Sequence, residues 1–207
     1  MNYFNTIFLC IIFFLLRSLV FQSMTLLFNN KSKFRKQIIS TINDKDISQK
    51  QYDREKTTWI SILFSSFELF FLFYVKILPP LTSFQIFTFK SVILCLITHL
   101  TLVEFIYYCV HVLMHHPKIY PKLHKHHHLS VITTPKTSVS FLPLEHLFYD
   151  CLFALPLIVP YYYFNSFSII QILFYIPLMD LINTLGHTNV ELFSIGWHDT
   201  FMGKFFY

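Results

Sequence analysis

The segment HVLMHHPKIYPKLHKHHH, residues 111–128, determines how the rest of this chain must be arranged. It gathers seven of the eleven histidines of the sequence. Imidazole is a common metal ligand, and so many rings side by side could not all carry protons without strong repulsion. On a helix, His111 and His115 lie one turn apart on one face, so their ring nitrogens can reach one ion. The segment therefore predicts a metal site.

A second group of histidines follows a short, proline-containing link. It reads His124-x-x-His127-His128, in which the first two lie about one helical turn apart and the third can serve a second ion. His116 and His126 fall between these positions, and we expect them at the surface or behind the ligands. The set exceeds the four ligands of a tetrahedral zinc site, so we predict that two metal ions share it.

Long apolar runs lie on both sides of the histidine segment. The chain is 54% hydrophobic and only 13% charged, about half of the roughly 25% typical of a soluble domain. These features predict an all-α fold, a polytopic membrane helical bundle. The expected spans are 3–28, 59–78 and 84–103, followed by a helical hairpin over 147–185 that breaks at Asn165 and Ser166.

The distribution of charge predicts how the bundle is oriented. The loop 31–56 carries eight basic and four acidic side chains, which gives it +4 of the total +5. The positive-inside rule puts this loop in the cytosol. The third span then returns to the cytosol, continues as a helix through His111 and His115, and stops near Pro117. We therefore predict a histidine cluster on the cytosolic side.

Several polar groups fall within the apolar runs. Arg17 is costly in hydrocarbon unless it snorkels or pairs, and Asp180 needs a partner in the metal shell or within the bundle. His99 is expected to be a packed helix residue. The cysteines lack zinc-ribbon spacing and are predicted to be small buried residues; they are Cys10, Cys95, Cys109 and Cys151.

The histidine groups and their surroundings resemble the fatty acid hydroxylase and sterol desaturase superfamily. The motifs that carry the resemblance are EFIYYCVHxxxHH from Glu104, LHKxHHxS from Leu123, TPxTSV from Thr134, Glu145-His146 and GHxNxEL from Gly186. The later motifs are most similar to the eceriferum branch, the aldehyde decarbonylase relatives of wax biosynthesis. The resemblance implies an integral membrane non-haem di-iron enzyme of the endoplasmic reticulum.

The resemblance also implies which residues hold the metals. The candidate ligands are His111, His115, His124, His127, His128, His187 and His146. His187 is implied as a ligand because it follows the helical hairpin, which returns it to the side of the main cluster. His146 is a candidate without an assigned role, as is its neighbour Glu145. Glu104 either orients a ligand histidine or lies at the membrane interface, and His198 falls outside every motif.

The chain departs from the family pattern at four places. Val112 stands where arginine is usual, Cys109 where tryptophan is usual, and Phe141 where the eceriferum branch has a histidine. A third His-x-x-His-His group is expected just beyond Tyr207. We therefore divide the chain into membrane spans, 1–103, and a hydroxylase-like domain, 104–207, that we expect to be incomplete at its C-terminus.

These features predict a membrane-bound oxidoreductase of lipid biosynthesis. Two iron ions with dioxygen as co-substrate would act on a long-chain lipid by aldehyde decarbonylation, hydroxylation or desaturation, with electrons from cytochrome b5 or a reductase. One alternative is a catalytically inactive partner subunit of a complete paralogue. Others are a sterol desaturase or hydroxylase, and a zinc-binding or metal-transport protein. We expect no nucleic-acid partner, because the basic loop lies between apolar runs rather than on a soluble module.

Overall fold

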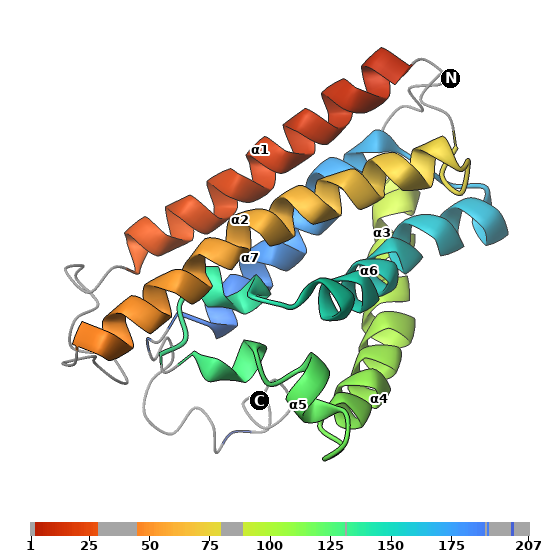
Figure 1. Ribbon diagram of the computed structural model, residues 1–207. Coiled ribbons are helices and arrows are strands. Elements are labelled where there is room, and N and C mark those ends of the chain that lie inside the picture. Colours follow the sequence, from red (N-terminus) through yellow and green to blue (C-terminus); the bar gives the residue numbers. More distant parts are fainter. Residues whose placement is uncertain are drawn as a thin grey trace.

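The computed structural model describes residues 3–28, 45–79, 89–130, 132–188, 190 and 200 (Figure 1). The main helices are α1 Tyr3–Leu27, α2 Lys45–Tyr74, α3 Phe89–Thr98, α4 Glu104–Met114, α5 Tyr120–Leu123, α6 Pro143–Phe164 and α7 Ile176–Gly186. The shorter helical turns are η2 His99–Val103, η3 His127–Leu129, η4 Pro135–Val139 and η5 Gln171–Tyr175. No β-strand occurs among the described residues, so the predicted all-α class is confirmed.

Four helical segments are long and apolar enough to cross a membrane. They are Phe4–Leu27, Gln49–Tyr74, Phe89–Met114 and Pro143–Phe164. Their outer faces expose large apolar side chains such as Phe67, Phe71 and Phe105. A lipid bilayer accepts such faces, because each helix satisfies its own backbone hydrogen bonds. The chain is a multi-pass membrane protein.

The second helix begins earlier than predicted. We expected it to begin near Trp59, after the loop 31–56, but α2 begins at Lys45. No proline or glycine interrupts the end of that basic segment, and side chains one turn apart support the helix. Gln49 Nε2, for example, donates to Asp53 Oδ1 at 3.1 Å. The helix therefore extends beyond the apolar span, and residues 31–44 lie outside the described part.

The third helix carries the first two histidines of the cluster. α3, η2 and α4 follow one another without a break, and α4 ends at Met114, after which a turn at His115 leads to Pro117. The amide of His115 still bonds to the carbonyl of His111 at 3.1 Å. The predicted continuation through His115 is thus confirmed. The π-helical turn His99–Val103 was not predicted, and the expected start near Phe84 lies outside the described residues.

The predicted hairpin is confirmed as a pair of helices. α6 ends at Phe164 because Asn165 adopts a left-handed conformation with φ 48°, which a helix cannot continue through. α7 follows η5 and leads back to His187, whose ring centroid lies 5.9 Å from that of His127. The return of His187 to the histidine cluster is therefore observed.

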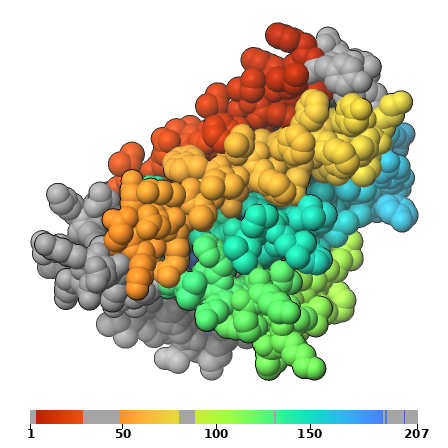
Figure 2. All heavy atoms as spheres, viewed as in Figure 1, coloured from red at the N-terminus to blue at the C-terminus, as the bar shows by residue number. Residues whose placement is uncertain are grey.

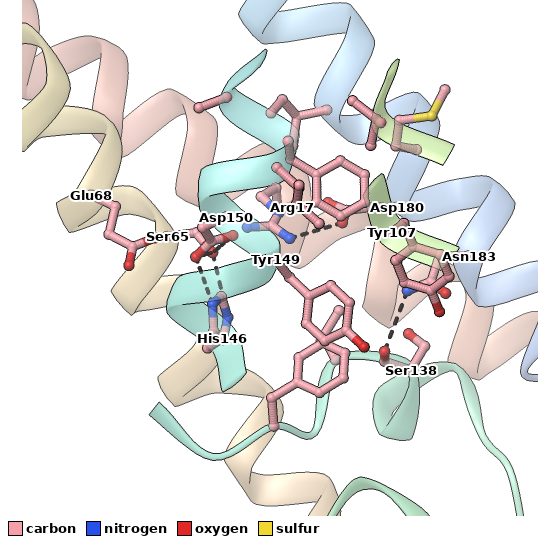
Figure 3. A pocket seen from close by; sticks show the side chains of 18 of the residues that line it. Arg17, Ser65, Glu68, Tyr107, Ser138, His146, Tyr149, Asp150, Asp180 and Asn183 are labelled. Carbon is pink, nitrogen blue, oxygen red and sulfur yellow. Dashed lines mark hydrogen bonds and ion pairs between the residues drawn. The ribbon is translucent and has the colours of Figure 1, made fainter. Parts of the chain in front are cut away.

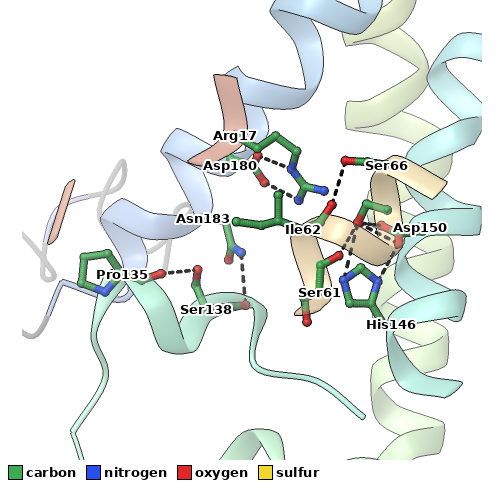
Figure 4. Close-up of polar contacts among 11 residues, drawn as sticks. Arg17, Ser61, Ile62, Ser66, Pro135, Ser138, His146, Asp150, Asp180 and Asn183 are labelled. Atoms are coloured by element: carbon green, nitrogen blue, oxygen red, sulfur yellow. Dashed lines mark hydrogen bonds and ion pairs between the residues drawn. The ribbon is translucent and has the colours of Figure 1, made fainter. Parts of the chain in front are cut away.

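A buried ion pair joins the first helix to the last. Arg17 on α1 donates from Nε to Asp180 Oδ2 at 2.6 Å and from Nη2 to Oδ1 at 2.8 Å (Figure 4). Both side chains are only 7% exposed. Each is thus the partner that the other was predicted to need. The pair lies where α1 packs against α7, and α1 also packs along α2.

The apolar core lies between α1, α2, α6 and η5, the turn of helix that precedes α7. Its centre includes Phe13, Phe73, Leu157 and Tyr175, all buried. Cys95 is buried there too, as predicted. The prediction is wrong for Cys109 and Cys151, which are exposed because they lie on the outward faces of α4 and α6. None of the four cysteines forms a disulfide.

Candidate metal centre

Four imidazoles from two segments converge at one point. α4 supplies His111 and His115, and the turns after α5 supply His124 and His128. One nitrogen from each ring lies within 4.8 Å of the nitrogens of the other three. These segments, green in Figure 2, lie together along one side of the molecule beside the beginning of α6. The structure thus brings together four of the seven predicted ligands.

Short local hydrogen bonds fix the second pair of rings. α5 is a single turn, and the chain then curls tightly so that the amide of His127 bonds to the carbonyl of His124 at 3.1 Å. This turn puts His124 and His128 on the side that faces α4. The ring of Tyr120 stacks on that of His115 with centroids 5.5 Å apart, which restrains the first pair.

The ring nitrogens face one another in a way that suits a bound cation. His115 Nε2 lies 3.2 Å from His111 Nε2, and His128 Nε2 lies 2.8 Å from His124 Nε2. Metal–nitrogen bonds of about 2.0–2.1 Å place neighbouring ligand nitrogens roughly 3 Å apart. In a neutral imidazole only one nitrogen carries a hydrogen, so nitrogens turned toward each other offer lone pairs to one ion.

A buried carboxylate orients one of these rings. His124 Nδ1 lies 2.5 Å from Glu145 Oε1, and both side chains are 0% exposed. In the tautomer that this contact favours, Nδ1–H donates to the carboxylate and the Nε2 lone pair points at the other imidazoles. Metal-binding histidines commonly have such a partner, which fixes the ring and strengthens its basicity. Glu145, whose role was unassigned, is thus placed behind His124.

We expect the substitution Glu145→Gln to weaken metal binding without unfolding the helices. The amide is nearly isosteric, but it removes the negative charge that holds the His124 ring, so the affinity should fall by about 10–100-fold. Isothermal titration of the metal-free chain with Fe²⁺ or Co²⁺ measures this. Glu55→Gln removes a carboxylate from α2 and should leave the affinity unchanged. Equal affinities for the two variants would contradict the role given to Glu145.

Burial favours the neutral form of four histidines at and beside the cluster. Burial, followed by repulsion from neighbouring imidazoles, lowers the pKa of His124 to about 4. Burial and then His187 lower the pKa of His127 to about 3. Burial also lowers the pKa of His128 and of His187. Neutral imidazole is the form that binds metal, so these four rings need not lose protons to accept a cation.

The lowered pKa of His127 predicts a stability that depends on pH. Between its unfolded pKa of about 6.5 and its native pKa, only the unfolded chain takes up the proton, so the fold loses stability as the pH falls through this range. The metal-free variant His127→Gln should reduce this loss by up to about 1.4 kcal/mol per pH unit below pH 6.5. Detergent-unfolding curves at pH 5 and pH 7 measure it. The matched variant His116→Gln, at an exposed position, should keep the wild-type slope.

Two further predicted ligands lie beside the four-histidine group. The ring of His127 lies 5.6 Å from that of His124 and 5.9 Å from that of His187. His187 Nδ1 is engaged by the carbonyl of Asn183 at 2.9 Å, which leaves Nε2 free to bind. Phe141, which stands where the eceriferum branch has a histidine, packs on His127 with centroids 4.8 Å apart. His127 and His187 thus form a smaller pair next to the main group.

His146 is not part of either group. Its Nδ1 lies 2.5 Å from Asp150 Oδ2, and its Nε2 lies 3.5 Å from Ser65 Oγ on α2. The ring of Phe141 lies between it and the cluster, 6.0 Å from the His146 ring. His146 and Asp150 form a second constellation with Glu68, whose ligand atoms also lie within 4.8 Å of one another.

The remaining histidines have other surroundings. His116 is exposed, and His126 is half-buried. His99 is buried in the bundle as predicted, with Nδ1 2.7 Å from Tyr175 Oη. Glu104 lies 3.1 Å from His99 Nε2, so it orients none of the four clustered histidines. His198 lies outside the described residues.

A cavity of about 480 Å³ connects the histidines to the interior of the bundle (Figure 3). His111, His127 and His128 line it at the cluster. Apolar side chains line its inner part, among them Phe13, Leu69, Leu72, Val103, Leu157 and Met179. The Arg17–Asp180 pair and the His146 group also border it. The cavity is therefore apolar over most of its wall, with polar groups at a few fixed points.

Sequence reasoning missed two carboxylates at this cavity, Asp150 and Glu68, which accompany His146. It named Glu145, but not its contact with His124. Both missed residues carry a signal in the sequence. Asp150 follows His146 by four residues on a helix, and Glu68 is a lone carboxylate in an apolar run, a pattern that marks functional positions in membranes.

Comparison with known proteins then identifies the family. A family model described as fatty acid hydroxylase matches residues 96–206, more than half of the chain. The chain belongs to the fatty acid hydroxylase family. No solved structure matches it.

The relatives of this fatty acid hydroxylase family member lie in the eceriferum branch. "Protein CER1-like 1" of Arabidopsis thaliana is 38% identical over 152 residues, 73% of this chain and 24% of the relative. "Very-long-chain aldehyde decarbonylase CER1" of the same plant is 34% identical over 88% of this chain and 28% of the relative. "Very-long-chain aldehyde decarbonylase GL1-4" of Oryza sativa subsp. indica is 35% identical over 73% and 24%. The chain spans about a quarter of the length of these curated relatives. The superfamily and branch inferred from the motifs are confirmed.

Proposed function

We propose that this chain is a membrane-bound, iron-dependent oxidoreductase that acts on a long-chain lipid. The observation that carries the proposal is the position of four converging imidazoles at one end of an apolar cavity within the bundle. A metal site at this position can meet one end of a lipid whose tail lies among the helices. A water-soluble substrate would not need such a cavity.

The donor set fits iron. Imidazole ligands suit iron, copper, nickel and zinc, whereas sites for magnesium and calcium use oxygen ligands. The nitrogen pairs of the cluster have the separations expected around one ion, and Glu145 supports the most buried ring. Iron bound here would supply redox chemistry with dioxygen, which zinc does not possess.

A second iron would draw on His127 and His187. Their rings lie next to the four-histidine group, and His187 Nε2 is not used in the contact with Asn183. Two imidazoles are fewer than a transition ion usually binds, so the second ion needs further ligands.

The side chains around the cavity have distinct roles in this proposal. Tyr107 stacks on His111 with centroids 5.4 Å apart and packs against Tyr149 at 5.6 Å, so these rings cover the cavity side of the cluster. They exclude water from the lipid end that approaches the metal. The apolar wall then fixes which carbon of the chain lies closest to the histidines.

The names of the relatives favour a fatty aldehyde as substrate. Two of them are described as very-long-chain aldehyde decarbonylases. We propose aldehyde-to-alkane chemistry first, and hydroxylation or desaturation as the other outcomes of the same site. Electrons would come from cytochrome b5 or a reductase. The proposed location is the endoplasmic reticulum membrane, with the histidine cluster toward the cytosol, on the positive-inside argument.

One observation favours a second function. Phe141 packs on His127 where a relative would offer an imidazole, which reduces the ligands available for a second ion. On this alternative the chain binds lipid and one metal without turnover, as the partner subunit of a complete paralogue.

A labelling experiment tests the proposal. Cells that produce the full chain are fed a deuterated long-chain aldehyde with and without oxygen, and their lipids are compared with those from cells producing His128→Ala. We expect an oxygen-dependent product, an alkane one carbon shorter or a hydroxylated lipid, with the wild-type chain only. Product that forms only when a complete relative is co-produced, and increases with this chain, would support the partner subunit. Identical lipids in every culture would overturn both proposals.

A further inference from the structure

Glu68, His146 and Asp150 form a constellation of their own inside the membrane bundle. Glu68 lies on α2, and the other two lie one turn apart on α6. One ligand atom from each lies within 4.8 Å of the others. Figure 3 shows the three side chains next to Ser65 at the cavity. The ring of Phe141 contacts both His146 and His127, with centroids 6.0 and 4.8 Å away. The constellation is thus separate from the four-histidine group.

The polar contacts within this group leave one carboxylate unsatisfied. His146 Nδ1 lies 2.5 Å from Asp150 Oδ2, and Ser65 Oγ lies 2.9 and 3.1 Å from the two carboxylate oxygens of Asp150 and 3.5 Å from His146 Nε2. The carbonyl of Ser61, 3.1 Å from Ser65 Oγ, is an alternative acceptor for the one hydroxyl hydrogen. Both oxygens of Glu68 are shut off from solvent, and no N–H or hydroxyl donor among the described residues reaches them; the carboxyl group of Asp150 faces them instead. A buried carboxylate without donors is expensive, and in a membrane more so.

The charges around the cavity do not balance. Arg17 already donates two hydrogen bonds to Asp180, so that pair is neutral. Glu68 and Asp150 lie close enough to share one proton, and one negative charge then remains on the pair. A divalent cation between these side chains would displace that proton, pair with both carboxylates and take a nitrogen of His146 as a further ligand.

We propose that Glu68, His146 and Asp150 bind a divalent transition-metal ion, with Ser65 Oγ as a further oxygen ligand. One imidazole with two carboxylates suits Zn²⁺, Mn²⁺ or Fe²⁺, whereas the four-imidazole cluster is richer in nitrogen. The ion would bind α2 to α6 at the wall of the cavity. This site is independent of the proposed lipid chemistry, because none of its residues belongs to the histidine cluster.

Metal titration in a background without the histidine cluster tests this site alone. The full chain with His111, His115, His124, His127, His128 and His187 replaced by alanine is purified in detergent, stripped with a chelator and titrated with Zn²⁺ and Co²⁺. We expect one ion per chain, and a cobalt absorption spectrum typical of mixed nitrogen and oxygen ligands. Glu68→Gln and Asp150→Asn, added singly, should weaken binding by roughly tenfold or more, since even outer-shell changes cost about 10–100-fold.

The matched control is Asp53→Asn, which removes an exposed carboxylate from the same helix α2 and should change nothing. Circular dichroism checks that each variant keeps its helices.

If the background variant does not fold, ions are counted in the otherwise wild-type chain, where Glu68→Gln should lose one ion and keep those of the cluster. Equal binding by Glu68→Gln, Asp150→Asn and Asp53→Asn would overturn the proposal, and so would a folded background variant that binds no ion. Failure of the lipid assay would leave this result unaffected.

Discussion

Replacement of His128 by alanine is expected to lower the affinity of the chain for iron by more than about 100-fold, since loss of a direct ligand exceeds the 10–100-fold cost of losing a supporting group. His128 Nε2 lies 2.8 Å from His124 Nε2, on the inside of the cluster. The side chain is exposed, so its removal opens no cavity in the core. The effect should therefore fall on metal binding and leave folding intact.

The control for this variant is His116→Ala. It removes an imidazole from the same segment, but one that is exposed and outside the four-histidine group. Iron content after loading and gel filtration, together with a thermal unfolding curve, separates the two effects. We expect His116→Ala to retain the wild-type iron content. Similar iron contents in the two variants would mean that the cluster does not bind the ion.

Replacement of one member of the buried Arg17–Asp180 pair should reduce the stability of the fold more than any other single substitution. Arg17→Leu leaves the Asp180 carboxylate buried in the bundle without its two donors. Loss of one member of a buried pair costs about 3–5 kcal/mol. We therefore expect Arg17→Leu and Asp180→Leu each to shift detergent-unfolding curves strongly, and little of either protein to reach the membrane in folded form.

The double variant distinguishes the pair from simple packing. Arg17→Leu with Asp180→Leu removes both charges, and apolar replacement of a whole buried pair is often neutral or stabilising. The double variant should therefore be more stable than either single variant. If the double variant instead loses as much free energy of unfolding as the two single variants together, the two side chains do not act as a pair.

Most of the fold follows from residues that a reader can find in the sequence. The apolar runs, Pro117 and Asn165 predict where the helices end, and the structure agrees. The start of α2 was missed because hydropathy reports the membrane span, whereas Lys45 begins a helix that extends beyond it. The π-helical turn at His99–Val103 has no marker in the local sequence, and it packs against α6, a helix far away in the chain.

The candidate site was predicted in part. Helical spacing brings His111 and His115 together, but spacing alone could not show that His124 and His128 would complete the same group. The position of His146 could not be predicted, because it depends on contacts with Ser65 on α2, far away in the chain. The support of His124 by Glu145 likewise crosses from one segment to another. As metal ligands, the seven histidines remain a prediction.

X-ray absorption spectroscopy of the iron-loaded chain tests the central claim most directly. The difference between the wild-type spectrum and that of the variant lacking His111, His115, His124 and His128 isolates the iron bound by these four rings. We predict that this difference shows the scattering pattern of imidazole rings, with iron–nitrogen distances of about 2.0–2.2 Å. Spectra that are the same for both proteins, or iron surrounded by oxygen alone in the wild type, would contradict the account.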